Sequence, residues 1–262
     1  MRMLGFSGRR FTKHVQRLCV GLTVLAMLSG SVAAQPPALV VSVAASVYDA
    51  LEEIAGLYRA ATGVTVALNA GGSNTLARQI VEGAKAGLFL SADEAQMDAV
   101  AKSGRIVAGT RTRLLTNELA IVVSKSSADV TLARVLEGRI ARLAMGEPGA
   151  VPAGVYGRKW LEHEQAWQRV EGKVVPFPTV RAVLSAVESE RVDAGIVYRT
   201  DAMSSSVRVI AHIARTQHPY LDISYPVAVI AGPSEADARR FLEYLKGPAA
   251  RAVFDRRGFG RP

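Results

Sequence analysis

The stretch LVVSVAAS, from Leu39 to Ser46, decides how the rest of the chain is interpreted. Its unbroken apolar run with β-branched residues predicts a strand that is buried on both faces. Ser46 follows as the expected cap of a helix whose apolar residues recur at helical spacing as far as Tyr58, and Gly63 ends the unit. A strand that leads directly into a helix is the building block of α/β proteins.

The same unit recurs along the chain. A strand at 64–68 leads through Ser73 into a helix at 74–82, and a short strand at 88–90 is followed by Asp93 and another helix. Further strands are expected at 118–124, 140–145, 173–177, 194–198, 206–211 and 225–230, and further helices after Pro152, Thr179 and Ser234, the last of them stopped by Gly247 and Pro248.

The order of these units predicts an α/β fold of two lobes, each a mainly parallel sheet flanked by helices, with more than one chain crossing between them. We expect lobe one at 38–117 plus 222–262 and lobe two at 118–221. A chain of 262 residues is long enough to bury cores of this size.

The formal charge of +9 suggests a nucleic-acid ligand, but much of this charge lies at the beginning of the chain. Five of the 32 basic residues fall within residues 1–17, which carry no acid. An uncharged apolar stretch at 19–32 and small residues up to Ala34 follow, which is the pattern of a secretory signal peptide at 1–34. The remaining chain has 27 basic and 23 acidic residues and no cysteine. We therefore expect an exported, periplasmic protein that does not bind nucleic acid.

Four of the predicted units place a helix start directly after a strand. The residues concerned are Ser46, Ser73, Ala153 behind Pro152, and Val180 behind Thr179. The first N–H groups of a helix have no intrahelical partner and lie at the positive end of the helix dipole, so they suit an anion. Most such residues are structural caps that contact no ligand, and this alternative stays open for each of them taken alone.

Several phrases, in this order, resemble the periplasmic molybdate-binding proteins of ABC transporters, the ModA family. The phrases are Ala44-Ala45-Ser46, Gly71-Gly72-Ser73, Phe89-Leu90-Ser91-Ala92-Asp93, Val151-Pro152-Ala153-Gly154-Val155-Tyr156, Val180-Arg181, Gly195-Ile196-Val197-Tyr198, Tyr225-Pro226-Val227-Ala228-Val229 and Tyr244-Leu245-Lys246-Gly247-Pro248. The resemblance covers residues 38–260. It implies a type II periplasmic binding protein fold with a hinge between the two lobes.

The resemblance also implies a ligand site. The donors would be the hydroxyl and N–H groups of Ser46 and Ser73, the N–H groups of Ala153 and Val180, and the phenol of Tyr198. Molybdenum would be bound there as the oxyanion molybdate, with tungstate as an equivalent ligand, and no cofactor is expected. The resemblance implies a protein that delivers this ligand to the membrane permease and ATPase subunits of an ABC transporter, and we expect it to be a monomer.

A site made only of donors favours a fully deprotonated dianion. Molybdate, tungstate and sulfate meet this condition, whereas phosphate keeps a proton near neutral pH and is best met by an acceptor such as Asp. Sulfate therefore remains the alternative ligand in the same fold. Two positions beside the expected site depart from the family pattern: Gly87 stands where an acidic residue is common, and Asn74 where a second Ser is common.

An exported hydrolase is the enzymatic alternative. The chain has no Gly-x-Ser-x-Gly motif, and its four histidines, His14, His163, His212 and His218, include no helical pair suited to a metal. An organic carboxylate would normally require an Arg, and none is among the five expected donors. We therefore expect a binding protein for an inorganic oxyanion rather than an enzyme.

Overall fold

The computed structural model describes residues 38–262. The signal peptide expected at 1–34 lies outside the described residues. Within residues 38–262, no helix is long and apolar enough to cross a membrane.

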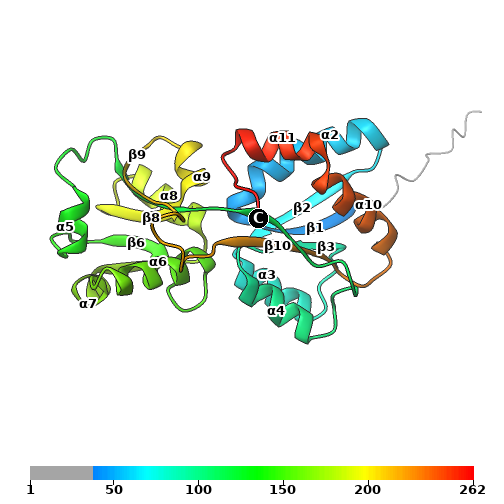
Figure 1. Ribbon diagram of the computed structural model, residues 1–262, viewed down its shortest axis with the longest axis horizontal. Helices are drawn as coiled ribbons and strands as arrows, with labels where there is room; N and C mark the ends of the chain where they lie inside the picture. Colours follow the sequence, from blue (N-terminus) through cyan, green and yellow to red (C-terminus); the bar gives the residue numbers. More distant parts are fainter. Residues whose placement is uncertain (1–37) are drawn as a thin grey trace, which may run out of the picture. The chain divides into compact units, whose positions relative to one another are not determined.

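The first sheet has five strands in the order β2-β1-β3-β10-β4. Their bounds are Leu39–Ala44 for β1, Val66–Gly71 for β2, Leu88–Leu90 for β3, Thr112–Thr116 for β4 and Ser224–Val229 for β10. The helices of this part are α2 (Tyr48–Thr62), α3 (Ser73–Val81), α4 (Glu94–Lys102), α10 (Glu235–Lys246) and α11 (Pro248–Arg256). Figure 1 shows α2 and α11 over one face of the sheet and α3 and α4 over the other. Because both faces are covered, β1 is apolar along almost its whole length.

The second sheet has the order β7-β6-β8-β5-β9. Its strands are β5 (Leu119–Ser124), β6 (Leu143–Gly146), β7 (Val174–Phe177), β8 (Ala194–Tyr198) and β9 (Val207–Ile213). Its helices are α5 (Leu132–Leu136), α6 (Pro152–His163), α7 (Trp167–Val170), α8 (Val180–Glu188) and α9 (Arg199–Met203). Helices α6 and α7 lie on one face and α8 and α9 on the other (Figure 1). All residues of β5 and β8 are buried.

The chain passes between the two sheets twice, from β4 to β5 and from β9 back to β10. The first passage is short and consists of Asn117 and Glu118, whereas the second is the segment 214–223. Residues Ala38–Pro262 form one compact unit. The strands of the first sheet fall in the ranges expected for lobe one and those of the second in the range expected for lobe two.

The two-sheet α/β architecture agrees with the expected fold class, but the sheets are more mixed than expected. Each has two parallel and two antiparallel strand pairs. In each sheet the antiparallel pairs involve the strands next to the passages, because a chain that returns from the other sheet enters in the opposite direction. The helix after Ser234 ends at Lys246 with Gly247 as its C-cap, as expected. The sequence analysis did not predict the further helix α11, which begins at Pro248, where the missing N–H is harmless.

Candidate functional site

The five residues expected to hold the ligand line one small cavity. Its walls also contain backbone and small side chains from both sheets, and every lining residue is uncharged. The residues are Ala44, Ala45, Ser46, Gly71, Gly72, Ser73, Ala92, Val151, Pro152, Ala153, Thr179, Val180 and Tyr198. Residues from six separate segments of the sequence therefore converge on this cavity.

Helix starts form much of the cavity wall. Ser73 and Val180 are the first residues of α3 and α8, and Ser46 lies in the 3₁₀ turn η2 (Ala45–Val47) that precedes α2. In α6 the first residue is Pro152, so Ala153 supplies the first N–H group of that helix. The first N–H groups of these helices have no intrahelical partner, and they border the cavity at the positive ends of the helices.

The start of α6 lies close to the end of β6 because Gly154 has no side chain. A Cβ atom at Gly154 would lie 2.1 Å from the carbonyl oxygen of Gly146, which is too close for any side chain. A larger residue at this position would push the helix start, and with it the N–H of Ala153, away from the cavity.

The cap predictions were right for some helices and wrong for others. Thr179 and Asp93 cap α8 and α4 through their side chains, as expected. Ser46 and Ser73 do not cap: the residue before α2 is Val47, the residue before α3 is Gly72, and neither helix start has a side-chain capping bond. The hydroxyl groups of these two serines are instead engaged by groups distant in the sequence.

The oxygen of each serine accepts a hydrogen bond from the protein. Ser73 Oγ accepts the N–H of Ala92 at 3.0 Å. Ser46 Oγ lies 2.9 Å from the hydroxyl of Tyr225, a buried residue of β10. Because Ser73 Oγ already serves as an acceptor, its own hydrogen is available to an acceptor in the cavity.

The direction of the Ser46–Tyr225 bond follows from Asn117. Asn117 Oδ1 accepts the N–H of Glu118 at 2.9 Å, so the amide nitrogen is the donor group of this side chain. That nitrogen donates to Thr200 Oγ1 at 2.9 Å and to the hydroxyl of Tyr225 at 3.1 Å. The buried Tyr225 hydroxyl then donates to Ser46, which leaves the Ser46 hydrogen for the cavity; this assignment is the one that satisfies the network. Sequence reasoning did not assign a role to Asn117 or Tyr225.

Tyr198 contributes a donor without any partner. Its side chain is 1% exposed, and its hydroxyl has no hydrogen-bond partner among the described residues. The ring packs edge to face against Tyr225 with centroids 5.8 Å apart, which fixes its position. Burial raises the pKa of the phenol well above its ordinary value, so the group stays protonated and can donate.

Elements of the two sheets also meet beside the cavity. Arg181 of α8 donates to Asp49 of α2 at 2.8 Å. A Cβ atom at Gly72 would lie 2.7 Å from the carbonyl oxygen of Pro178, so the segment before α3 lies directly against the segment before α8. These contacts connect the two halves of the cavity wall.

Two buried carboxyl groups lie near the cavity without lining it. Burial raises the pKa of Asp201 to about 7, although the charge of Arg181 opposes the shift. Arg181 Nε lies 3.0 Å from Asp201 Oδ1, but its N–H does not point at that oxygen. Burial also raises the pKa of Asp93 to about 6, against hydrogen bonds from the Gln96 N–H and the Ser91 hydroxyl.

The two departures from the family pattern lie outside the cavity wall. A Cβ atom at Gly87 would lie 2.5 Å from a methyl carbon of Leu39, so a side chain at this position would displace the end of the Leu39 side chain. The side chain of Asn74 folds back toward Gly72, and its Oδ1 is buried without a partner among the described residues. Neither Gly87 nor Asn74 lines the cavity.

The fold and this cavity define the class of protein: two α/β halves around a small polar cavity, as in proteins that bind a solute between their lobes. Residues 39–260 match the family model described as bacterial extracellular solute-binding protein, and the chain belongs to this family. Members of this family bind solutes, which agrees with the expectation of a binding protein rather than an enzyme.

Individual relatives indicate which group of solute-binding proteins this chain resembles. The chain is 38% identical to the molybdate-binding protein ModA of Escherichia coli over 251 residues, which cover 92% of this chain and 96% of the relative. The resemblance to the ModA proteins is thereby confirmed. The solved periplasmic molybdate-binding protein of Azotobacter vinelandii has the same fold, with a TM-score of 0.76 at 24% identity over 86% of this chain and 99% of that one.

The fold alone does not select the ligand. The sulfate-binding protein SubI of Mycobacterium tuberculosis also superposes, with a TM-score of 0.73 at 15% identity over 86% of each chain. The choice between oxyanions therefore depends on the residues of the cavity.

Proposed function

We propose that this protein is the periplasmic solute-binding component of an ABC importer and that it captures molybdate. The ligand would occupy the cavity lined by Ser46, Ser73, Ala153, Val180 and Tyr198. The observation that carries the proposal is the buried Tyr198 hydroxyl, which is a donor without a partner among residues 38–262 at a cavity lined only by uncharged residues. A bound oxyanion would satisfy it.

The chemistry of the donors supports a fully deprotonated dianion. The oxygen atoms of Ser46 and Ser73 each already accept a hydrogen bond, which leaves both hydroxyl hydrogens available to the ligand. Phosphate would keep a proton, no carboxylate lines the cavity to accept it, and a buried unpaired donor costs about 1–3 kcal/mol. Tungstate has the charge and nearly the size of molybdate, and we propose that it binds equally well.

Transport follows from the position of the cavity between the halves. A ligand that contacts both halves stabilises the form in which they are together, and this closed form would be recognised by the permease and its ATPase subunits.

We further propose that residues 1–34 are a signal peptide cleaved after Ala34, that the division into lobes is at 118 and 222, and that the mature protein is a monomer.

Calorimetric titration of the purified protein with molybdate, tungstate, sulfate and phosphate tests this proposal. We expect tight binding of the first two, and strongly reduced binding in the double variant Ser46→Ala with Ser73→Ala. The matched control is Ser103→Ala with Ser189→Ala, which removes two hydroxyl groups that donate to backbone carbonyls away from the cavity. Equal molybdate affinity of both double variants would refute the site.

Sulfate is the second candidate, because a sulfate-binding protein has the same fold. If sulfate binds more tightly than molybdate in the same titration, the site is retained and the ligand is corrected. Selection against sulfate must come from size, since a smaller ion cannot reach every donor at once.

A further inference from the structure

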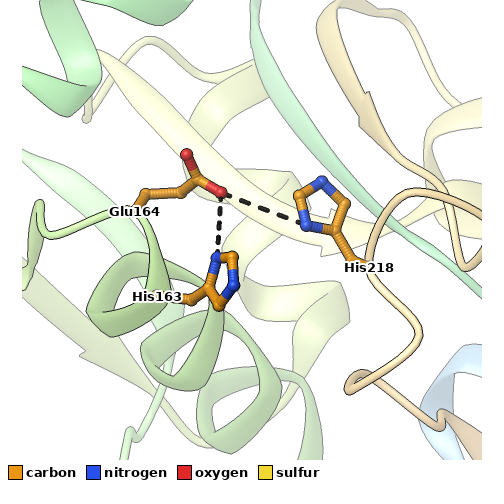
Figure 2. Close-up of side chains that lie close together, drawn as sticks. All are labelled: His163, Glu164 and His218. Carbon is orange, nitrogen blue, oxygen red and sulfur yellow. Dashed lines mark hydrogen bonds and ion pairs between the residues drawn. The ribbon is translucent and has the colours of Figure 1, made fainter.

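A second cluster of polar side chains lies at the far end of α6. His163 is the last residue of this helix, Glu164 follows it, and His218 belongs to the segment 214–223 that returns from β9 to β10. Figure 2 shows the Glu164 carboxylate between the two imidazole rings. The cluster is separate from the oxyanion cavity, because α6 has 12 residues and is about 18 Å long, with Pro152 at the cavity end.

The geometry points to a binding site for a divalent transition metal of the zinc class, formed by His163, Glu164 and His218. One ligand atom of each side chain lies within 4.8 Å of the other two. His163 Nδ1 is 3.4 Å and His218 Nδ1 is 4.0 Å from Glu164 Oε1. In a tetrahedral zinc site with bonds of 2.0–2.2 Å, neighbouring ligand atoms are about 3.4 Å apart, so small side-chain rotations complete the geometry.

The choice of metal follows from the donor atoms. Two imidazoles with one carboxylate are ligands that zinc and the neighbouring transition metals prefer, whereas magnesium and calcium require oxygen ligands. The side chain of His163 is 57% exposed and that of Glu164 is 30% exposed, so an ion can enter from solvent. Water can occupy the remaining position of the ion.

The surroundings hold the ligands in place. The ring of His163 stacks on Tyr220 with centroids 4.2 Å apart. The Tyr220 hydroxyl lies 3.2 Å from His218 Nδ1, and it would turn away when that nitrogen binds the ion. The nearby cation Lys159 points its ammonium group at the carbonyl oxygen of Tyr220, at 2.7 Å. The carbonyl groups at the C-terminal end of α6 add negative partial charge where the metal ion would bind.

A bound ion would fasten the returning segment to α6. The same helix already contacts this segment through Lys159 and through the Tyr156 hydroxyl, which donates to the carbonyl of Asp222 at 3.5 Å. The ion would therefore stabilise one of the two passages between the sheets. Sequence reasoning missed the cluster, because the histidines are far apart in the sequence and form no helical pair.

Calorimetric titration of the metal-stripped protein with ZnCl₂, without a polyhistidine tag, tests the site. We expect one zinc ion per chain and a zinc-dependent rise of Tm. The variants His163→Ala, His218→Ala and Glu164→Gln should each weaken zinc binding about tenfold or more. The matched control is His212→Ala on β9, an exposed histidine outside the cluster, and it should bind zinc like the wild type.

Two results would overturn the proposal. One is the absence of zinc binding to the wild-type protein. The other is wild-type affinity in both His218→Ala and Glu164→Gln; the latter is nearly isosteric and is expected to fold normally. The double variant Ser46→Ala with Ser73→Ala should keep its zinc affinity, which separates this site from the oxyanion cavity; loss of zinc binding there would place the ion in the cavity instead.

Discussion

Replacing Tyr198 with Phe removes one oxygen from the cavity wall and changes almost nothing else. The ring is 1% exposed and packs against Tyr225, so the Phe ring can take the same place. In the structure the hydroxyl has no partner among the described residues, and its loss breaks no hydrogen bond within the protein. We therefore expect the unliganded variant to unfold at the same Tm as the wild type or at a higher one.

The affinity for the ligand should fall in the same variant, although its stability is not reduced. A hydrogen bond to a charged group contributes about 1.5–3 kcal/mol, and each 1.4 kcal/mol is a factor of ten in Kd. Tyr198→Phe should therefore weaken molybdate binding roughly 10- to 150-fold. The assay is calorimetric titration together with thermal unfolding of the unliganded protein.

A matched variant separates this donor from a general effect of losing a tyrosine hydroxyl. Tyr58→Phe changes another buried tyrosine, which packs against Phe241 and does not line the cavity. It should leave the molybdate affinity unchanged. If Tyr198→Phe binds molybdate as tightly as Tyr58→Phe does, the phenol is not a ligand donor and the reasoning from its unpaired hydroxyl is wrong.

Three further changes test the surroundings of the cavity. Asn117→Asp replaces the amide that donates to Tyr225 with an acceptor, which turns the hydroxyl hydrogen of Tyr225 away from Ser46. Molybdate affinity should therefore fall about tenfold, although residue 117 does not line the cavity. An unchanged Kd would contradict the proposed direction of these hydrogen bonds. Gly72→Ala places a Cβ 2.7 Å from the carbonyl oxygen of Pro178. It should weaken molybdate binding by about 1–3 kcal/mol, as measured by calorimetric titration. Wild-type affinity would show that this close contact is unimportant for binding. Asp201 has a folded-state pKa of about 7, above its value in the unfolded chain, so the native state holds this proton to higher pH. The free energy of unfolding of the wild type should therefore fall as pH rises from about 4 to 7, by up to about 1.4 kcal/mol per pH unit. Asp201→Asn removes this contribution, so its stability relative to wild type should increase between pH 4 and pH 7 in denaturant titrations, and parallel curves would refute the assignment.

The sequence predicted the elements whose causes are local. The run at Leu39 is apolar because β1 is buried, Pro152 opens α6 because its missing N–H is harmless there, and Thr179 caps α8 through its own hydroxyl. These signals depend on neighbours within a few residues. They were sufficient to place four helix starts that the structure brings to one cavity.

What the sequence could not predict depends on partners far along the chain. Ser46 and Ser73 are of a residue type that commonly caps helices, but their hydroxyl groups form hydrogen bonds with Tyr225 and with the N–H of Ala92. Nothing near either serine in the sequence specifies these contacts, because they arise from the order of strands in the first sheet. Likewise, His218 lies beside Glu164 only because of the path of the returning segment.

The relative affinities of sulfate and phosphate provide a test of the donor arrangement that does not depend on size. Sulfate and phosphate are similar in size, but only phosphate carries a proton near neutral pH, and no carboxylate lines the cavity to accept it. The oxygens of Ser46 and Ser73 already accept hydrogen bonds from Tyr225 and from the Ala92 N–H, so their hydrogens are available to the ligand. Sulfate should therefore compete with molybdate more strongly than phosphate does, by about 1–3 kcal/mol for the one unpaired proton. Displacement of bound molybdate by each ion at pH 7 and equal ionic strength measures this difference. Stronger competition by phosphate would mean that the cavity contains an acceptor, and the assignment of the hydroxyl hydrogens would have to be reversed.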